Sequence, residues 1–268
     1  MPGPGHDPLE NPLRRIWAEG GVVINGWLHI PSSFASEVMA HQAWDSLTLD
    51  AQHGPFEFSS AVGMIQAIQT TPTAVVVRVG WNDPGQIMKY LDVGAHAVIC
   101  PMINTPAECE AFVQACRYPP QGFRSYGPTR AALHFGPGYA SGANGFVVTM
   151  PMIETVLALE NLEQILDVAG VDAIFVGPGD LGQALYGEAQ IDRETPEFLV
   201  TLEHIAKTAR AKGINAGIFT GSGAYAKKMI GLGYNFVTIS SDARLLAIAA
   251  KQVLNEIRDD NAQAKSGY

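Results

Sequence analysis

The chain alternates short, continuously apolar runs with longer amphipathic stretches. The short runs are rich in β-branched residues, which is typical of strands buried on both faces. The longer stretches repeat their apolar positions every three to four residues, which is typical of helices that cover a sheet. The eight predicted strands are Val22–Leu28, Ser46–Asp50, Ala74–Val79, Ala97–Pro101, Val147–Ile153, Ala173–Val176, Asn215–Phe219 and Phe236–Ser240.

Start and stop signals bound the predicted helices. A side chain that can accept a backbone N–H bond precedes several amphipathic stretches, often with proline or an acid in the first turn. These starts are Ser32-Ser33, Asn82-Asp83-Pro84 and Thr105-Pro106-Ala107-Glu108. Glycine, which readily takes a left-handed conformation, ends several of the same stretches. These ends are Gly94, Gly170, Gly213 and Gly233.

Unbroken apolar strands that are each followed by a helix predict a parallel sheet covered by helices. Eight such units favour closure into a (β/α)8 TIM barrel. An open doubly wound sheet is the competing fold, but no GxGxxG follows the first strand. The segment Arg117–Asn144 is predicted to be a long loop with a role in function or partner contact. We expect one barrel domain over residues 1–268, with an irregular tail at 1–12 and a flexible tail at 259–268.

Composition narrows the class of protein. The 268 residues include 17 basic and 26 acidic side chains, a formal charge of −9, with 47% hydrophobic and 16% charged residues. These values argue against a disordered chain, a coiled coil and a nucleic-acid partner. No apolar run is long enough for a membrane span, and the N-terminal residues resemble neither a signal peptide nor an anchor. Three cysteines, without zinc spacing, fit a reducing compartment, so we expect a cytoplasmic protein.

Two acidic residues end neighbouring predicted strands. Glu154 follows the fifth strand, and Asp180 follows the sixth. The chemistry of such barrels lies at the carboxyl ends of the strands, and two carboxylates there suit a hard divalent cation such as Mg²⁺, Mn²⁺ or Co²⁺. The alternative is that Glu154 caps the predicted helix TVLALENLEQIL and that Asp180 caps the helix after it.

Arg78 and His53 are the other candidates at strand ends. Arg78 ends an apolar strand, where a fixed guanidinium can bind a carboxylate or an oxyanion. Its alternative role is a structural ion pair with an acid on a neighbouring strand. His53 lies beside Asp50 and can serve as a general base near neutral pH. Asp92 can orient His53 only if the fold brings the two together, and otherwise it is a solvated helix acid.

A glycine-rich turn and the placement of the lysines bear on the mechanism. Gly177-Pro178-Gly179 presents backbone N–H groups at a helix start and can cradle a carboxylate, although glycine is also common in such turns for steric reasons. All seven lysines lie in predicted helices or in the tail. No lysine therefore ends a strand as a Schiff-base nucleophile, and this favours a metal-stabilised enolate.

Six ordered motifs resemble the metal-dependent class II pyruvate aldolases, typified by 4-hydroxy-2-oxoheptanedioate aldolase and 2-keto-3-deoxy sugar-acid aldolases. The resemblance extends over Trp17–Ile257. The motifs are LDAQH (Leu49–His53), VRVGWNDPGQIMKYLDVGA (Val77–Ala95), PMINTPAE (Pro101–Glu108), RYPPQGFRSYG (Arg117–Gly127), MIET with ENLEQIL (Met152–Leu166) and GVDAIFVGPGDL (Gly170–Leu181). The resemblance implies a barrel of the phosphoenolpyruvate/pyruvate-domain type.

The resemblance also implies roles for individual residues. Glu154 and Asp180 would hold the metal, which would chelate the keto and carboxylate oxygens of pyruvate or a related 2-oxo acid. Arg78 would stabilise the enolate oxygen. His53, oriented by Asp92, would move the proton through a metal-bound water.

The same resemblance implies a binding pocket and an assembly. The backbone at Gly179-Asp180 would receive the substrate carboxylate, and Trp27 would line the pocket. Members of the family form trimers or hexamers that exchange C-terminal helices, which implies this role for the helix Asp242–Arg258.

Three positions depart from the pattern of the family. Gln52 stands where a glutamate is usual, Met152 stands where a glutamine is common, and Ser125-Tyr126 replace a Gly-Val pair. Gln52 resembles a subgroup that accepts hydroxypyruvate as the nucleophilic partner. Met152 removes a polar contact near the metal and is expected to change the fit of the substrate.

The expected function is a class II aldolase that interconverts a 4-hydroxy-2-oxo acid with an aldehyde and a 2-oxo acid, either pyruvate or hydroxypyruvate. A citrate-lyase-like or malyl-CoA-lyase-like enzyme is the alternative, but the chain shows no basic cluster for the phosphates of CoA. A barrel that binds a small acid without catalysis is the alternative from another class.

Overall fold

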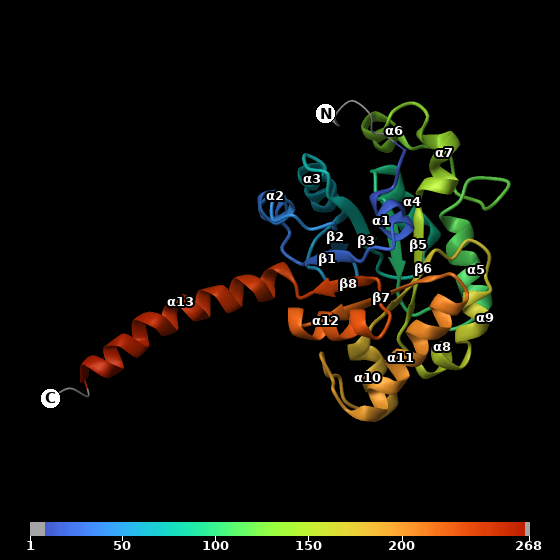
Figure 1. Ribbon diagram of the computed structural model, residues 1–268. Coiled ribbons are helices and arrows are strands. Elements are labelled where there is room, and N and C mark those ends of the chain that lie inside the picture. Colours follow the sequence, from blue (N-terminus) through green and yellow to red (C-terminus); the bar gives the residue numbers. More distant parts are fainter. Residues whose placement is uncertain (1–8, 266–268) are drawn as a thin grey trace.

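A computed structural model, which describes residues 9–265, shows a closed barrel of eight parallel strands in chain order (Figure 1). The strands are β1 (Val23–Leu28), β2 (Ser46–Asp50), β3 (Ala74–Arg78), β4 (Ala97–Cys100), β5 (Val148–Ile153), β6 (Ala173–Val176), β7 (Asn215–Thr220) and β8 (Phe236–Ile239). Every predicted strand is present with its ends within one residue of the expected bounds. The predicted (β/α)8 TIM barrel is therefore confirmed, and the open sheet is excluded.

Helix α1 precedes the first strand, and most of the other helices follow the strands and cover the outside of the barrel (Figure 1). They are α1 (Pro12–Ala18), α2 (Ser33–Ala40), α3 (Phe58–Ile68), α4 (Pro84–Asp92), α5 (Pro106–Ala115), α6 (Thr129–Phe135), α7 (Tyr139–Phe146), α8 (Val156–Glu160), α9 (Leu162–Leu166), α10 (Pro178–Tyr186), α11 (Pro196–Ala211), α12 (Gly223–Gly231) and α13 (Asp242–Lys265).

The predicted helix ends have the expected physical causes. The side chains of Ser32, Asp83 and Thr105 each accept a backbone N–H of the helix that they precede, and Glu108 completes a capping box with Thr105. The four predicted glycine ends all have positive φ angles, which side chains with a Cβ rarely adopt: Gly94, Gly170, Gly213 and Gly233.

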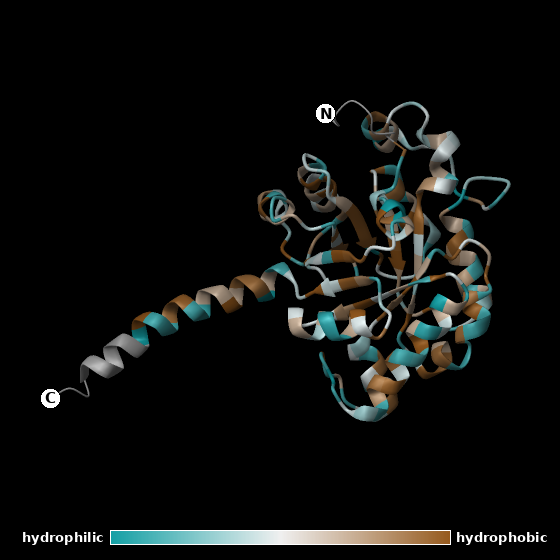
Figure 2. Cartoon of the chain, viewed as in Figure 1, coloured by the Kyte–Doolittle hydropathy of each residue, from teal (hydrophilic) through white to brown (hydrophobic). Residues whose placement is uncertain are grey.

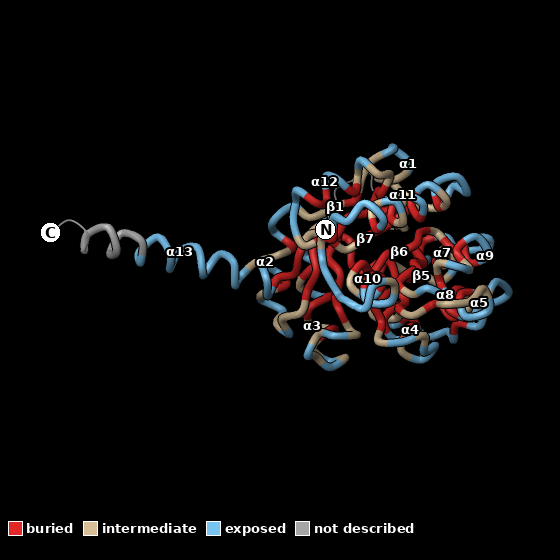
Figure 3. The backbone as a smooth tube through the Cα atoms, turned by 90° about the horizontal axis from the view of Figure 1, so that it is seen from below, coloured by how far each residue is buried: buried red, intermediate tan, exposed pale blue. Residues whose placement is uncertain are grey.

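Two layers of apolar side chains form the core. Alternate strand residues fill the barrel, including Val76, Met150 and Phe175. The residues between them face outward and form a second, larger cluster with the helices. Burial is concentrated on the strands and the inner faces of the helices (Figure 3). All three cysteines, Cys100, Cys109 and Cys116, are free and belong to the outer cluster, where burial raises the pKa of each thiol.

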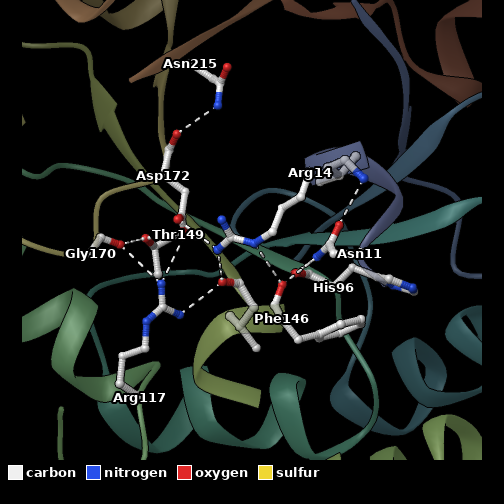
Figure 4. Close-up of polar contacts among 11 residues, drawn as sticks. Asn11, Arg14, His96, Arg117, Phe146, Thr149, Gly170, Asp172 and Asn215 are labelled. Carbon is white, nitrogen blue, oxygen red and sulfur yellow. Dashed lines mark hydrogen bonds and ion pairs between the residues drawn. The ribbon is translucent and has the colours of Figure 1, made fainter. Parts of the chain in front are cut away.

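Helix α1 closes the end of the barrel where the strands begin. Leu13 is fully buried among the interior side chains, and the Nδ2 atom of Asn11 donates hydrogen bonds to the carbonyls of His96 and Phe146, at 2.9 Å and 2.8 Å. Figure 4 shows the neighbouring network, in which the Asp172 carboxylate binds Arg14 at 2.8 Å and Arg117 at 3.0 Å. This end is sealed by structural contacts.

The segment Arg117–Asn144 is not the long loop that we predicted, because it contains α6 and most of α7. The short apolar runs around Phe135 and Tyr139 are buried, and the two rings stack at 5.4 Å. Glycines and prolines divide the segment into pieces too short to show a clear helical period. The segment joins α5 to β5, so it lies at the end of the barrel opposite the carboxyl ends of the strands.

Two further helices differ from expectation. The predicted helix TVLALENLEQIL is divided at Asn161 into α8 and α9. The C-terminal helix, expected to end at Arg258, continues to Lys265 as α13 and projects away from the barrel. Residues 1–8 and 266–268, which belong to the predicted tails, lie outside the described residues. The extent of the single domain stays a prediction. No helix within residues 9–265 has the length and apolar character needed to cross a membrane.

His96 leads to a prediction about stability. It lies before β4 against the rings of Phe135 and Phe146, and its Nδ1 atom accepts the Val75 N–H at 3.0 Å. Burial lowers the pKa of His96 to about 3. Below about pH 6.5 the unfolded chain therefore binds a proton that the folded chain excludes, so stability falls as the pH falls towards 3.

We expect this group to lower the free energy of unfolding by about 2 kcal/mol between pH 7.5 and pH 5. The variant His96→Asn, whose amide oxygen can still accept the Val75 N–H, should lose that part of the pH dependence in urea unfolding. The exposed His41 offers the control His41→Asn, which should keep the wild-type dependence. Equal pH dependence in wild type and His96→Asn would contradict the prediction.

Candidate active site

Three polar side chains form a row across β1, β2 and β3 at the carboxyl ends of the strands. Asp50 is in register with Arg78, and His29 follows the paired residues Leu28 and Leu49, so it lies beside Asp50. Because side chains alternate along a strand, these three positions continue the inward-facing series of their strands. The row therefore faces the mouth of the barrel.

The carboxylate of Asp50 is the centre of this row. It accepts bonds from Arg78 Nε at 2.9 Å, Arg78 Nη2 at 2.6 Å, His29 Nε2 at 2.8 Å and Trp27 Nε1 at 3.1 Å. The backbone N–H groups of Gln52 and His53 complete the set, at 3.1 Å and 3.2 Å. Burial alone would raise the pKa of Asp50, but the bonds from His29, Arg78 and Trp27 and the charge of Arg78 hold it well below its usual range.

Arg78 has the structural ion pair that the sequence left as its alternative role. Its side chain is 11% exposed, so the guanidinium is held by Asp50 while part of it reaches the mouth. The ring of Trp27 lies beneath the guanidinium at 4.9 Å and packs on Phe175 and Phe219, at 5.7 Å and 5.5 Å. Trp27 is 2% exposed and forms the floor below Arg78.

Glu154 lies at the end of β5 and is buried. Its Oε1 atom accepts the Met102 N–H at 2.7 Å, and Met102 has a φ of 56°, which is unusual for a residue with a side chain. Burial, and to a smaller extent the charge of Asp180, raise the pKa of Glu154. The Met102 N–H and the charge of Arg78 lower it, and the net pKa is about 7. Thr155 caps α8, so Glu154 does not have the helix-capping role that was its alternative.

Gly177 leaves the space that the Glu154 carboxylate occupies. A Cβ atom added at Gly177 would lie 2.4 Å from Glu154 Oε2 and 2.9 Å from Met152 Cε. Asp180 is exposed in the first turn of α10, and the N-cap of that helix is Gly177, so Asp180 does not cap it. Across the residues that the structure describes, no group of three or more His, Cys, Asp or Glu side chains is gathered for a metal.

His53 and Asp92 are not brought together within one chain. His53 is exposed in the turn after β2, at the mouth of the barrel. Asp92 ends α4, which runs back from β3 towards the opposite end, and its carboxylate binds Arg124 at 2.7 Å. The buried Arg124 guanidinium also lies 4.4 Å from the ring of Tyr118. The role of Asp92 as a partner of His53 stays a prediction, and one chain by itself does not supply it.

No role in the site was assigned to His29 from the sequence, although it lies at the end of the first predicted strand. The spacing indicates its position, because His29 lies two residues after Trp27 and side chains two residues apart on a strand point to the same face. Met102 was missed because an N–H that binds Glu154 depends on a backbone conformation, which residue types do not reveal. Gly177 was considered for its N–H, whereas its absent Cβ is what the Glu154 carboxylate requires.

The site therefore combines two kinds of charge at one mouth. Glu154 is a buried carboxylate, and the exposed Asp180 is close enough for its charge to raise the pKa of Glu154. Together the two acids offer hard oxygen ligands. A fixed guanidinium faces them from β3, where it can bind an anion without further reorganisation. Two imidazoles, His29 and His53, lie on the turns beside it. This arrangement suits a small, anionic carbonyl compound.

Comparisons with known proteins agree with this geometry. The family model described as HpcH/HpaI aldolase/citrate lyase matches residues 27–249. The chain is 40% identical over 248 residues to a hydroxypyruvate/pyruvate aldolase of Rhizorhabdus wittichii, covering 92% of this chain and 99% of the relative. It is 37% identical over 246 residues to a 4-hydroxy-2-oxo-heptane-1,7-dioate aldolase of Escherichia coli, covering 91% and 93%.

A solved structure extends the likeness to the fold. An HpcH/HpaI aldolase/citrate lyase family protein from Burkholderia cenocepacia is similar with a TM-score of 0.86 and 30% identity, covering 92% of this chain and 98% of that one. The family model and the relatives together span most of the described barrel. The chain belongs to the HpcH/HpaI aldolase/citrate lyase family.

Proposed function

We propose that the protein is a class II aldolase that joins a 2-oxo acid, pyruvate or hydroxypyruvate, to an aldehyde and reverses that reaction. The observation that carries the proposal is the buried Glu154 beside Asp180, at the same mouth as the fixed Arg78. Both curated relatives described above are aldolases, and they share most of the chain at 37% and 40% identity. A citrate-lyase-like or malyl-CoA-lyase-like activity and a barrel without catalysis are therefore not favoured.

A divalent cation fits the acids of this site. Burial raises the pKa of the Glu154 carboxylate, and the Met102 N–H and the charge of Arg78 compensate its negative charge only in part. Glu154 and Asp180 would hold Mg²⁺, Mn²⁺ or Co²⁺, with water or substrate completing the shell. When bound, the cation would polarise the keto oxygen of a 2-oxo acid and acidify the protons on C3.

The other side chains would position the substrate and move its proton. Arg78, immobilised by Asp50, would stabilise the negative charge on the keto oxygen. The N–H groups at Gly179-Asp180, at the start of α10, would receive the substrate carboxylate. Trp27 would support Arg78 from below, and His53 would take the C3 proton. A cytoplasmic location is part of the same proposal.

Metal-dependent proton exchange tests this proposal. In deuterated buffer without aldehyde, the protein should exchange the C3 protons of pyruvate or hydroxypyruvate, because enolate formation precedes the attack on the aldehyde. Chelation with EDTA should abolish the exchange, and Mg²⁺, Mn²⁺ or Co²⁺ should restore it, as followed by proton NMR. Exchange that persists in EDTA would refute the metal-assisted mechanism.

Gly177 provides a test of the metal site that needs no turnover. Gly177→Ala should displace the Glu154 carboxylate and weaken Mn²⁺ binding in calorimetry by about tenfold or more, the effect expected when support of a ligand is lost. Gly223→Ala is the matched control, since Gly223 also starts a helix after a strand and a Cβ there meets nothing within 4 Å. The control should bind Mn²⁺ as the wild type does, and wild-type affinity in Gly177→Ala would remove Glu154 from the ligand set.

We also propose that the chain assembles as a homotrimer or homohexamer through α13. In proteins most of the stability of a helix comes from the packing of its apolar face, yet α13 projects from the barrel and carries apolar residues (Figure 2). Leu246, Val253 and Ile257 lie on one face at helical spacing and are 64%, 57% and 60% exposed. On α2, Phe34 and Val38 also form an exposed apolar pair, 73% and 47% exposed, which suits an apolar helix from a second copy.

The oligomeric state tests this assembly. The double variant Val253→Glu with Ile257→Glu should dissociate to the mass of one chain in size-exclusion chromatography with light scattering. The matched control, Gln252→Glu with Asn255→Glu, adds the same charge on the opposite face of α13 and should keep the wild-type mass. A wild-type protein that is monomeric would contradict the proposed assembly.

A further inference from the structure

His29 is an imidazole of the barrel mouth that the proposed function does not use. Its backbone N–H donates to Asp242 Oδ1 at 2.8 Å, and the next N–H, that of Ile30, donates to Asp242 Oδ2 at 3.1 Å. The carboxylate at the start of α13 thus fixes the turn after β1. The imidazole is then fixed by its bond from Nε2 to Asp50 Oδ2, at 2.8 Å. Both the backbone and the ring of His29 are therefore held in place.

The partner of His29 determines which ring nitrogen carries the proton. Asp50 is fully buried and is surrounded by donors, which keep it ionised, so its oxygens only accept hydrogen bonds. Nε2 must therefore carry a proton in order to bond with Asp50. In the neutral imidazole, Nδ1 then carries no proton and has a free lone pair. A histidine that acts as a base needs this arrangement, in which a carboxylate binds one ring nitrogen and the other can accept a proton.

The free nitrogen of His29 can reach solutes. The His29 side chain is 32% exposed, whereas Asp50 is 0% exposed and the side chain of Arg78 is 11% exposed. Among the contacts of the described residues, no hydrogen bond reaches Nδ1. The charged groups facing His29 are Asp50 on β2, Arg78 beyond it on β3 and Asp242 on α13. His29 is therefore an oriented and accessible proton acceptor.

We propose that His29 transfers the proton of the aldehyde oxygen in the aldol reaction. This inference rests on the proposed function and adds a second proton-transfer group, separate from the one that acts on C3. Position supports the division, because the row runs from Arg78, beside the keto oxygen in the proposed function, through Asp50 to His29. A substrate bound at Arg78 and extending towards β1 brings its far end to His29.

The proton and electron balance of this step is simple. In cleavage, His29 Nδ1 takes the proton of the C4 hydroxyl of the 4-hydroxy-2-oxo acid. The O–H electrons form the C=O bond of the aldehyde, and the C3–C4 bond electrons pass to the enolate. In synthesis, the enolate carbon attacks the aldehyde carbon, and the resulting alkoxide takes the proton from the His29 imidazolium. No oxidant, reductant or additional reactant is needed.

Two reactions, exchange of the C3 protons and cleavage, distinguish the role of His29 from the roles of the other site residues. Exchange of the C3 protons of pyruvate needs no aldehyde, whereas cleavage of a 4-hydroxy-2-oxo acid does involve the aldehyde oxygen. The variant His29→Gln keeps an N–H that can donate to Asp50 but cannot exchange protons. It should lower kcat for cleavage by about 10²-fold or more, the usual value of general acid–base catalysis, and keep exchange close to the wild-type rate.

Rescue of His29→Ala by added imidazole, and a control variant at another histidine, make the test more specific. Added imidazole should restore part of the cleavage activity of His29→Ala, because the position is open to solvent. His41→Gln removes a histidine at the exposed end of α2, outside the site, and should leave both reactions unchanged.

The possible results separate the two proposals. Cleavage at the wild-type rate in His29→Gln would overturn the role of His29. Equal losses of cleavage and exchange would overturn it as well, since His29 would then act only by holding Asp50 and Arg78. Wild-type protein that neither exchanges nor cleaves in the presence of metal would overturn the proposed function and this inference together.

Discussion

The buried carboxylate of Asp50 joins the first three strands at the mouth of the barrel. Donors from β1, β3 and the turn after β2 surround it, so the charge is neutralised by hydrogen bonds and by Arg78. Removing one partner from such a set would leave a buried charge without compensation, which is costly in a medium of low dielectric constant. Asp50 therefore fixes the positions of Arg78, Trp27 and His29 together, and the proposed roles of these three residues depend on it.

The opposite side of the mouth has a different electrostatic character. Glu154 is buried with a single backbone donor, and the charge of Asp180 is nearby. A negative charge there is only partly compensated by the protein, in contrast to Asp50. Such a contrast between two carboxylates is typical of functional sites. Asp50, whose oxygens are fully hydrogen-bonded, holds other side chains in place, whereas Glu154, whose charge is only partly compensated, can bind a cation or a proton.

The two ends of the barrel divide stability from chemistry. At the end where strands begin, α1, Asn11 and the Asp172 ion pairs close the interior. At the carboxyl end, Asp50 and Arg78 are polar residues at inward-facing positions of their strands, and His29 beside them is partly exposed to solvent. Parallel strands place all their carboxyl ends on one side, so residues far apart in the chain can form one site there. The sealed end supports the open one by holding the strands in register.

The sequence by itself determined the eight strands, the helix caps and the polar residues that end the strands, because local periodicity and capping chemistry depend on near neighbours. It also indicated Glu154, Asp180, Arg78 and His53 as residues of one mouth. The helices within 117–144 and the division at Asn161 were not predicted, since these pieces are short and depend on distant packing.

Only the tertiary structure decided which of these side chains meet. In the folded chain Arg78 binds Asp50, and the Met102 N–H binds Glu154. His29 joins the row through Asp50, and Asp92 binds Arg124 instead of His53. These pairings depend on the register between strands and on the direction of each helix. Both are set by closure of the whole barrel, which no local stretch of sequence encodes.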